Sequence, residues 1–374
     1  RYWAHNPGPQ STTGTQPLIS IAKRNIGAGE PAFLIAEVAQ AHDGSLGLAH
    51  SYIDAAADAG ADAVKFQTHI AEAESTRDDQ FRINLSHQDD SRYAYWKRME
   101  FTPQQWAGLC DHARERDLIF LSSAFSPEAI RLLAALDMPA WKIASGETSS
   151  RVLIDAMAET KRPFIVSTGL SDWQEIDTIV QQIRPTDNAF ALLQCTSKYP
   201  TPFAEVGLNV MDEMRARFDC PVGLSDHSGS PFPAFAALAR GGSILELHIT
   251  LDRRMFGPDT CASLTVPEFS QVSAFRDALF QMDAGAVDKD HIARELSPTR
   301  QLFVRSLAPA HALRAGTMVT AEMTVPKKPG TGIPADMTET YVGRHLVRDI
   351  PADRLFCEED FDEHEPPRER VVAE

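Results

Sequence analysis

The chain has 374 residues, 43 % of them hydrophobic, which is enough for one large domain or two smaller ones. Its 36 Lys and Arg residues against 52 Asp and Glu residues give a formal net charge of −16, which argues against a nucleic-acid partner. The apolar runs are shorter than the ~20 residues of a membrane-spanning helix, and the five cysteines form no Cys-x-x-Cys pair. We therefore expect a cytoplasmic protein with reduced thiols that binds neither nucleic acid nor membrane.

The two ends of the chain differ from its middle. Residues 1–17 and 362–374 are polar and rich in turn-forming or acidic residues, so we expect both to be disordered tails. Residues 18–283 form the regular part of the chain, and residues 284–299 are expected to be a linker. Residues 300–361 hold short β-like runs and a Pro-rich turn, which predicts a small, mostly β second domain.

Within residues 18–283, short apolar runs alternate with amphipathic stretches at helical spacing. This alternation predicts parallel strands joined by helices, and eight such units are the size of a (β/α)₈ TIM barrel. A doubly wound open sheet is the alternative, although no Gly-rich dinucleotide motif follows the first run. Residues 70–102 interrupt the alternation and predict an insertion on the barrel rim. The eight predicted strands are 33–38, 63–67, 118–124, 140–144, 163–168, 189–194, 221–225 and 244–251.

Polar side chains lie at the C-terminal ends of all eight predicted strands. Enzymes with this barrel place their active sites at that end. Ordinary loop polarity does not explain Lys, Glu and His residues inside apolar strands, so we take these side chains as candidate site residues. In chain order they are Glu37, Lys65, Gln67, Ser123, Lys142, Ser145, Glu147, Ser167, Ser197, Tyr199, Ser225, Asp226, His227, Glu246 and His248.

Lys65 and Lys142 each lie inside an apolar strand, where an unpaired charge is costly. One interpretation pairs them with Glu37 or Glu147 as structural ion pairs. The interpretation that we favour is an anion pocket, in which two ammonium groups and several serine hydroxyls surround a phosphate or carboxylate. Such a pocket would let an acidic protein bind an acidic small molecule.

His227 and His248 are one β/α unit apart, so their side chains should meet at the barrel mouth. With Asp226 and Glu246 nearby, two imidazoles suit a divalent first-row metal with open positions. The alternative is a pair of hydrogen-bonded core or acid–base histidines. Cys195 ends the sixth strand, and a packing role is expected for it because no nucleophile arrangement accompanies it.

An ordered series of motifs resembles the sialic acid synthase family. The series runs from Ile35-Ala36-Glu37 through Lys65-Phe66-Gln67, Lys142-Ile143-Ala144-Ser145, Cys195-Thr196-Ser197-Lys198-Tyr199-Pro200 and Ser225-Asp226-His227 to Gly257-Pro258-Asp259. It extends from about residue 18 to residue 361 and includes the Pro-Gly-Thr-Gly-Ile turn of a C-terminal SAF (antifreeze-like) domain. Each motif is weak alone, and the ordered set is specific.

The resemblance implies a metal-dependent condensation of phosphoenolpyruvate with a sugar aldehyde, such as N-acetylmannosamine, to a nonulosonic acid and phosphate. It implies Mn²⁺, with Mg²⁺ or Co²⁺ as alternatives, held by His227 and His248. It also implies a homodimer in which the SAF domain of one chain covers the active site of the other. The phosphoenolpyruvate ligands would be Lys65, Ser123, Lys142, Ser145, Ser167, Ser197 and Ser225; Glu37, Gln67, Glu147, Tyr199, Glu246 and Asp259 would face the sugar and the reacting carbons.

The sequence departs from the family pattern at Ala41, Leu247, Thr260 and Lys328, where the family usually has Asn, Lys, His and Arg. Lys328 would then reach the sugar from the SAF domain. These changes fall mainly where the sugar should bind, so the acceptor can be another aldose or a modified hexosamine. The other functions considered are a different aldol-type condensation and a catalytically weak paralogue that binds carbohydrate.

Overall fold

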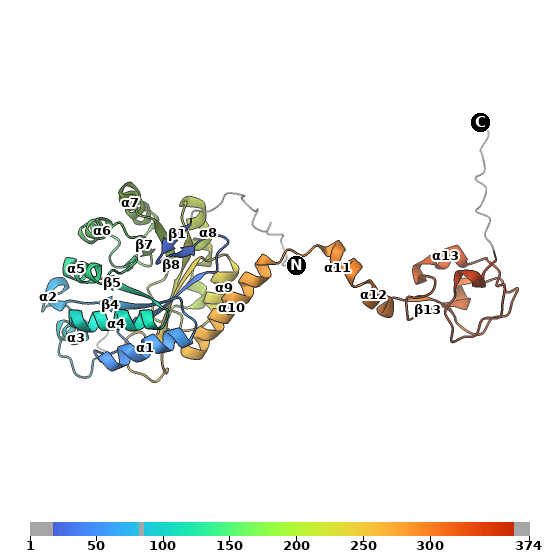
Figure 1. Cartoon of the computed structure of the whole chain (residues 1–374), viewed down its shortest axis with the longest axis horizontal. Helices are drawn as coiled ribbons and strands as arrows, with labels where there is room; N and C mark the ends of the chain where they lie inside the picture. Colours follow the sequence, from blue (N-terminus) through green and yellow to red (C-terminus); the bar gives the residue numbers. More distant parts are fainter. Residues whose placement is uncertain (1–17, 82–85, 363–374) are drawn as a thin grey trace, which may run out of the picture. The chain divides into compact units, whose positions relative to one another are not determined.

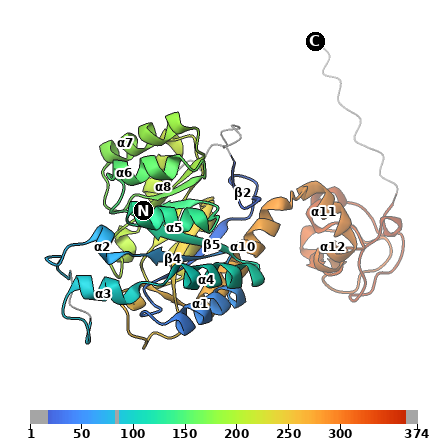
Figure 2. The same cartoon turned by 60° about the vertical axis from the view of Figure 1, so that its left-hand side comes forward.

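The computed structural model describes residues 18–81 and 86–362. The expected tails, residues 1–17 and 362–374, lie outside the described residues except for Asp362. The chain divides into two compact units between Ala284 and Gly285, which are described separately (Figures 1 and 2). No helix in the described part of the chain is long and apolar enough to cross a membrane.

The first unit is a closed barrel of eight parallel strands. Strand β10 pairs with β9 on one side and with β3 on the other, so the sheet has no free edge within the barrel. This closure confirms the predicted (β/α)₈ barrel, and the open-sheet alternative is wrong. The strands are β3 (Phe33–Ala39), β4 (Ala63–Thr68), β5 (Ile119–Ala124), β6 (Trp141–Ile143), β7 (Phe164–Ser167), β8 (Phe190–Cys195), β9 (Val222–Asp226) and β10 (Ile244–Thr250), with the short β11 (Leu264–Thr265) alongside β10.

Helices surround the strands (Figure 1). Several begin at polar caps that satisfy their first free N–H groups: Thr102 and Gln105, and likewise Asp172 and Glu175, form reciprocal capping boxes. The apolar faces of the helices pack on the outward side chains of the strands, where Trp106 and Trp141 are fully buried. The helices are α1 (Leu46–Asp58), α4 (Pro103–Glu115), α5 (Pro127–Ala135), α6 (Arg151–Ala158), α7 (Trp173–Ile183), α8 (Leu208–Arg217), α9 (Phe232–Ala239) and α10 (Val266–Ala284), with 3₁₀ turns η1 (Arg184–Thr186), η2 (Phe203–Glu205) and η3 (Thr260–Ala262).

A hairpin that the sequence did not predict closes one end of the barrel. Strands β1 (Ile19–Ile21) and β2 (Arg24–Ile26) pair antiparallel. Their three buried isoleucines, Ile19, Ile21 and Ile26, form one apolar cluster with Phe33 and other side chains from the beginnings of the barrel strands. The N-terminal end of the barrel interior is therefore apolar and filled, and the polar residues gather at the other end.

The predicted rim insertion, residues 70–102, contains two short helices, α2 (Ala71–Glu74) and α3 (Arg92–Met99) (Figure 2). Arg98 of α3 forms ion pairs with Asp89 and with Asp43, both at 2.8 Å. Asp43 belongs to the loop that follows β3, so these contacts fix the insertion over the C-terminal end of the barrel.

His42, in the same loop, is 1 % exposed, and its ring centroid lies 4.8 Å from that of Phe101. Its Nδ1 accepts a hydrogen bond from the Gly44 N–H at 3.1 Å. Burial lowers the pKa of His42 from 6.5 to about 3, with smaller contributions from His69 and Arg98. The folded protein therefore holds this ring neutral at pH values where the unfolded chain binds a proton.

We expect this residue to make the fold sensitive to acid. The unfolded ring takes up a proton as the pH falls through 6.5 and the folded ring does not until about pH 3, so stability is lost as the pH falls across this range. Between pH 7 and pH 5 the free energy of unfolding should fall by about 2 kcal/mol more in the parent than in His42→Asn. Denaturant titrations at both pH values measure this difference. Equal losses in both proteins would contradict the prediction.

The second unit begins with helices where a linker was expected: α11 (Lys289–Glu295) and α12 (Ser297–Phe303) occupy residues 289–303. The strands β12 (Ser306–Pro309) and β13 (Thr324–Lys327) then pair antiparallel. The unit has its own small apolar core of Leu307, Leu313, Val319, Ile333, Tyr341, Leu346, Ile350, Phe356 and Phe361. Its remaining elements are α13 (Thr338–Tyr341) and the 3₁₀ turns η4 (Ala321–Met323), η5 (Ala335–Met337) and η6 (Glu358–Asp360).

Candidate active site

A polar cavity of about 260 Å³ opens at the C-terminal ends of the barrel strands. The structure brings most of the predicted site residues together there. The cavity also contacts Phe125, Leu170 and Cys195, which the sequence did not assign to the site. The predicted residues that line it are Glu37, Lys65, Gln67, Ser123, Lys142, Ser145, Ser167, Ser197, Tyr199, Ser225, His227, Glu246 and His248.

Two lysines and two carboxylates form the charged centre of this cavity. Lys65 Nζ lies 2.7 Å from Glu37 Oε2 and 3.7 Å from Glu246 Oε2, and Lys142 Nζ lies 3.6 Å from Glu246 Oε1. All four side chains are almost completely buried. The predicted ion pair with Glu37 therefore exists, and Glu246, rather than Glu147, is the carboxylate that the two lysines share.

Burial and neighbouring charges set the protonation of this centre. Burial raises the pKa of Glu37 from 4.5 to about 7, although Lys65 opposes the rise. Burial lowers the pKa of Lys142, and only the charge of Glu246 opposes it strongly. Lys65 differs, because Glu246 and Glu37 outweigh its burial and raise its pKa. Lys142 is thus the lysine whose charge would gain most from a bound anion.

Serine hydroxyls surround the lysines. Lys65 Nζ donates to Ser123 Oγ at 3.2 Å, and Ser225 Oγ donates to Glu246 Oε1 at 3.3 Å. Ser167 Oγ is buried and has no hydrogen-bond partner among the described residues. A buried hydroxyl without a partner is costly, and an anion in the cavity would satisfy it.

Gly169 lies where this group of side chains is most crowded. A Cβ atom there would lie 2.5 Å from Ser197 Oγ, 2.7 Å from Cys195 Sγ and 2.9 Å from Ser145 Oγ. The Gly169 N–H donates to Ser145 Oγ at 3.1 Å. The missing side chain is what lets these polar groups converge.

Gly169→Ala should therefore weaken anion binding without unfolding the barrel. The three neighbours are side-chain ends that can move aside, but they would then leave the positions from which they face the cavity. We expect the dissociation constant for phosphoenolpyruvate, measured by calorimetry, to rise about tenfold, which corresponds to the loss of about one hydrogen bond to a charged group. Gly108→Ala, at a helix position with nothing within 4 Å of the new Cβ, is the matched control. An unchanged dissociation constant would contradict the prediction.

His227 and His248 meet at the cavity, with ring centroids 5.2 Å apart. His227 Nε2 lies 3.0 Å from the Tyr199 hydroxyl and its Nδ1 lies 3.0 Å from the Thr196 carbonyl oxygen. Burial opposes charge on His227, but Cys195 and the Thr196 carbonyl raise its pKa to about 9. Burial and the neighbouring His227 lower the pKa of His248, so that ring is neutral.

This pair fits a divalent cation with few protein ligands. His248 Nδ1 is buried without a hydrogen-bond partner among the described residues, and it lies 3.9 Å from Asp259 Oδ2. A cation would replace the additional proton that His227 otherwise binds. In the described part of the chain no three His, Cys, Asp or Glu side chains come close enough to hold a metal. Substrate or water would have to complete the coordination.

Four predicted site residues do not line this cavity: Asp259 lines the cavity described next, and the other three lie elsewhere. Glu147 does not line the cavity, because the chain turns away after the three-residue strand β6; burial and the charge of Glu74 raise its pKa. Asp226 accepts hydrogen bonds from the backbone and the hydroxyl of Ser228 and stabilises its own loop. Lys328 belongs to the second unit, where its Nζ lies 5.2 Å from the centroid of the Phe303 ring.

A second cavity of about 320 Å³, the outer cavity, adjoins the first and shares Gln67, Tyr199 and His248 with it. Asp259 lines this cavity, and the rim insertion supplies its aromatic wall. The sequence missed Gln40, because a bulge at Ala39, with φ of 49°, breaks the alternation after Glu37. The lining residues are Gln40, Gln67, Phe81, Arg92, Tyr95, Trp96, Tyr199, His248, Pro258 and Asp259.

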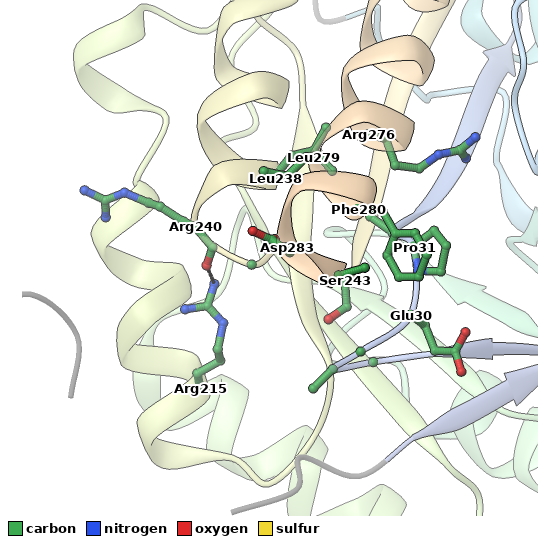
Figure 3. Close-up of a pocket in the computed structure, with 17 residues that line it drawn as sticks. Glu30, Pro31, Arg215, Leu238, Arg240, Ser243, Arg276, Leu279, Phe280 and Asp283 are labelled. Carbon is green, nitrogen blue, oxygen red and sulfur yellow. Dashed lines mark hydrogen bonds between the residues drawn. The ribbon is translucent and has the colours of Figure 1, made fainter. Parts of the chain in front are cut away.

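A larger depression, of about 570 Å³, lies at the N-terminal ends of β3 and β10 (Figure 3). Its arginines already have partners: Arg276 pairs with Asp62, and Arg215 and Arg240 both pair with Asp212. The N-terminal end of such a barrel serves stability rather than chemistry. The buried lysines, carboxylates and histidines therefore place the candidate active site at the C-terminal end of the barrel.

Comparisons with known proteins identify related sequences and structures. The sequence model of the NeuB family matches residues 52–285. The N,N'-diacetyllegionaminic acid synthase of Legionella pneumophila is 31 % identical over 87 % of this chain and 93 % of that protein. The human N-acetylneuraminate-9-phosphate synthase is 32 % identical over 91 % of this chain and 96 % of that protein. The crystal structure of the sialic acid synthetase from Leptospira borgpetersenii has a TM-score of 0.66 at 26 % identity and covers 77 % of this chain and 98 % of that chain.

Proposed function

The chain belongs to the NeuB family, and we propose that it condenses phosphoenolpyruvate with a sugar aldehyde to a nonulosonic acid and phosphate. The relatives named above are synthases of nonulosonic acids. The observation that carries the proposal is the convergence of Lys65 and Lys142, a set of serine hydroxyls and Glu37 in one buried cavity. This combination suits a phosphorylated carboxylic acid that reacts with water during turnover.

In the proposed reaction, Lys65 and Lys142 bind the carboxylate and phosphate of phosphoenolpyruvate together with the serines. The methylene carbon of phosphoenolpyruvate attacks the aldehyde carbon. The π bond of the aldehyde breaks and its oxygen takes a proton from solvent to become a hydroxyl, while the new C–C bond leaves a cationic carbon that bears the phosphate. Water adds to this carbon and Glu37 takes the proton from the water. A pKa of about 7 suits that role, because the group is then poised between acid and base near neutral pH. Cleavage of the C–O bond finally releases phosphate and forms the keto group.

We propose that His227 and His248 hold the divalent cation, Mn²⁺ or alternatively Mg²⁺ or Co²⁺. When bound, it would supply Lewis acidity toward the aldehyde oxygen. We further propose that the second unit is the SAF domain and that the protein is a homodimer in which Lys328 of one chain faces the sugar site of the other. Other aldol-type condensations, or a catalytically weak paralogue that binds carbohydrate, are the alternatives.

Phosphate release is the experiment that separates these functions. The full chain is mixed with Mn²⁺, phosphoenolpyruvate and one of a panel of aldoses and acetamido sugars. Release that requires both phosphoenolpyruvate and a sugar, together with a nine-carbon keto acid in the mass spectrum, supports the proposal. Release without a sugar, or none with any sugar, would overturn it.

A further inference from the structure

A chain of buried polar side chains runs from Glu37 to the rim insertion. Gln67 Nε2 donates to Glu37 Oε1 at 2.8 Å, and Gln40 Nε2 contacts both Gln67 Oε1 and His69 Nε2, the latter at 2.8 Å. His69 Nδ1 lies 2.6 Å from Glu74 Oε1. Gln40 and His69 are each only 6 % exposed. The candidate general base is thus linked through side chains to helix α2.

The direction of each hydrogen bond follows from the two ends of this chain. His69 Nδ1–H donates a hydrogen bond to Glu74 Oε1, and in that tautomer Nε2 carries no hydrogen and is an acceptor. Gln40 must then donate one N–H to His69 and the other to Gln67, whose own N–H groups face Glu37. Both amide hydrogens of Gln40 are used. Its carbonyl oxygen, on a residue that lines the outer cavity, accepts no hydrogen bond from any described residue.

His69 is held rigidly. Its ring is stacked between Trp96, with centroids 3.8 Å apart and planes 15° apart, and Phe125, with centroids 4.4 Å apart and planes 5° apart. Glu74, its other partner, also accepts from the Ile70 N–H at 3.3 Å. Side chains locked by packing and by a second set of hydrogen bonds are what a precise recognition site requires. The rigid His69 ring therefore fixes the orientation of the Gln40 side chain.

The charges in the outer cavity favour an uncharged ligand. Asp259 contributes a carboxylate and Gln40 a carbonyl. Of the described lining residues, Arg92 is the one cation: it lies 3.3 Å from Asp79, and its guanidinium lies 5.2 Å from the centroid of the Trp96 ring. The Asp259 carboxylate and the Gln40 carbonyl would accept hydrogen bonds from hydroxyl or amide donors, and the Asp259 carboxylate would repel a phosphate beside it, whereas the charge of Arg92 is already paired with Asp79.

We propose that Gln40, oriented by His69 and Glu74, determines the acceptor specificity of this enzyme. It accepts a hydrogen bond from an amide N–H or a hydroxyl of an uncharged, unphosphorylated acceptor sugar. This inference rests on the function proposed above. Gln40 acts on the acceptor, whereas His69 and Glu74 are positioning residues that act through it.

The test uses Gln40→Met and His69→Phe in the full chain with Mn²⁺. His69→Phe keeps the ring between Trp96 and Phe125 and removes the contacts of the ring nitrogens with Gln40, Gln67 and Glu74. In both variants KM for the best acceptor should rise about tenfold or more, since a buried polar contact is lost. The dissociation constant for phosphoenolpyruvate, measured without acceptor, should change less than about twofold, and kcat should fall by a smaller factor than KM for the acceptor rises. A structural defect would move these quantities together.

Matched variants isolate the positioning role. Glu74→Gln keeps an acceptor for His69 Nδ1 and should retain the parent's KM for the acceptor, whereas Glu74→Leu should behave like His69→Phe. His112→Phe makes the same substitution in α4, where His112 contacts His50 of α1, and should change nothing. The acceptor panel comprises 2-acetamido and 2,4-diacetamido hexoses and N-acetylmannosamine 6-phosphate, and we expect the phosphorylated sugar to be the poorest.

The outcomes distinguish this inference from the proposed function. If no sugar in the panel releases phosphate from phosphoenolpyruvate, the proposed function fails and the inference fails with it. If sugars react but Gln40→Met and His69→Phe keep the parent's KM for the acceptor, the inference alone is wrong. Preference for the 6-phosphate would overturn the assignment of an uncharged acceptor.

Discussion

His248→Ala is expected to reduce turnover on the order of a thousandfold, because under the proposed function the cation held by this residue would contribute several kcal/mol to the condensation as a Lewis acid. His227→Ala should have an effect of the same order. Both side chains lie at strand ends and face a polar cavity, so their removal should change the thermal midpoint of unfolding little. Initial rates with Mn²⁺ and calorimetric unfolding measure the two effects.

Metal binding gives this prediction a second readout. The parent should retain about one Mn²⁺ per chain in equilibrium dialysis, and both variants should retain much less. His50→Ala removes an imidazole from helix α1, where it contacts His112, and serves as the control. Full activity of either His227→Ala or His248→Ala in chelator-treated buffer would remove the metal from the proposed function.

Lys142→Met and Lys65→Met are expected to abolish detectable binding of phosphoenolpyruvate in both cases but to differ in stability. Lys142 pairs with Glu246, which keeps Lys65 at 3.7 Å when Lys142 is lost, so that variant should remain stable. Lys65→Met instead leaves Glu37 without its partner at 2.7 Å. Removing one partner of a buried ion pair in this way lowers the free energy of unfolding by roughly 3–5 kcal/mol.

Calorimetric titration with phosphoenolpyruvate and denaturant unfolding separate these two effects. The exposed Lys161, which hydrogen-bonds the Thr186 carbonyl, provides the control Lys161→Met. If both active-site variants bind phosphoenolpyruvate as the parent does, the lysines serve only as structural ion pairs. If Lys142→Met is the less stable variant, the charge arrangement described here is wrong.

The barrel could be predicted from the sequence because each strand is an apolar run of the right length between amphipathic helices. The hairpin of Ile19–Ile21 and Arg24–Ile26 could not be predicted, because each of its strands has only three residues. Its isoleucines are buried by contacts with strands that are distant in the sequence. Periodicity over three residues does not distinguish a strand from a loop.

Some residues of the candidate site could likewise be predicted from the sequence, and others could not. Lys65 and His248 could be found because a charged or polar residue inside an apolar strand is costly and therefore conspicuous. Gln40 and His69 follow strands, where polar residues are ordinary. The bulge at Ala39 brings Gln40 to the outer cavity, and stacking against Trp96 holds His69, which hydrogen-bonds Gln40. Glu147 follows the short strand β6 and is absent from the lining of the first cavity, so its role stays a prediction.

The isoleucine-filled hairpin also has a consequence for the route by which substrates enter and products leave. With the N-terminal end of the barrel sealed, everything that enters the two cavities must pass through the same mouth. The first cavity holds Lys65 and Lys142, and the outer cavity is lined mainly by the rim insertion and by residues of the loops that follow the strands. Under the proposed function, we expect phosphoenolpyruvate to bind before the sugar and phosphate to leave after the sugar acid. The enzyme would then follow an ordered sequential mechanism, in which inorganic phosphate competes with phosphoenolpyruvate for the free enzyme.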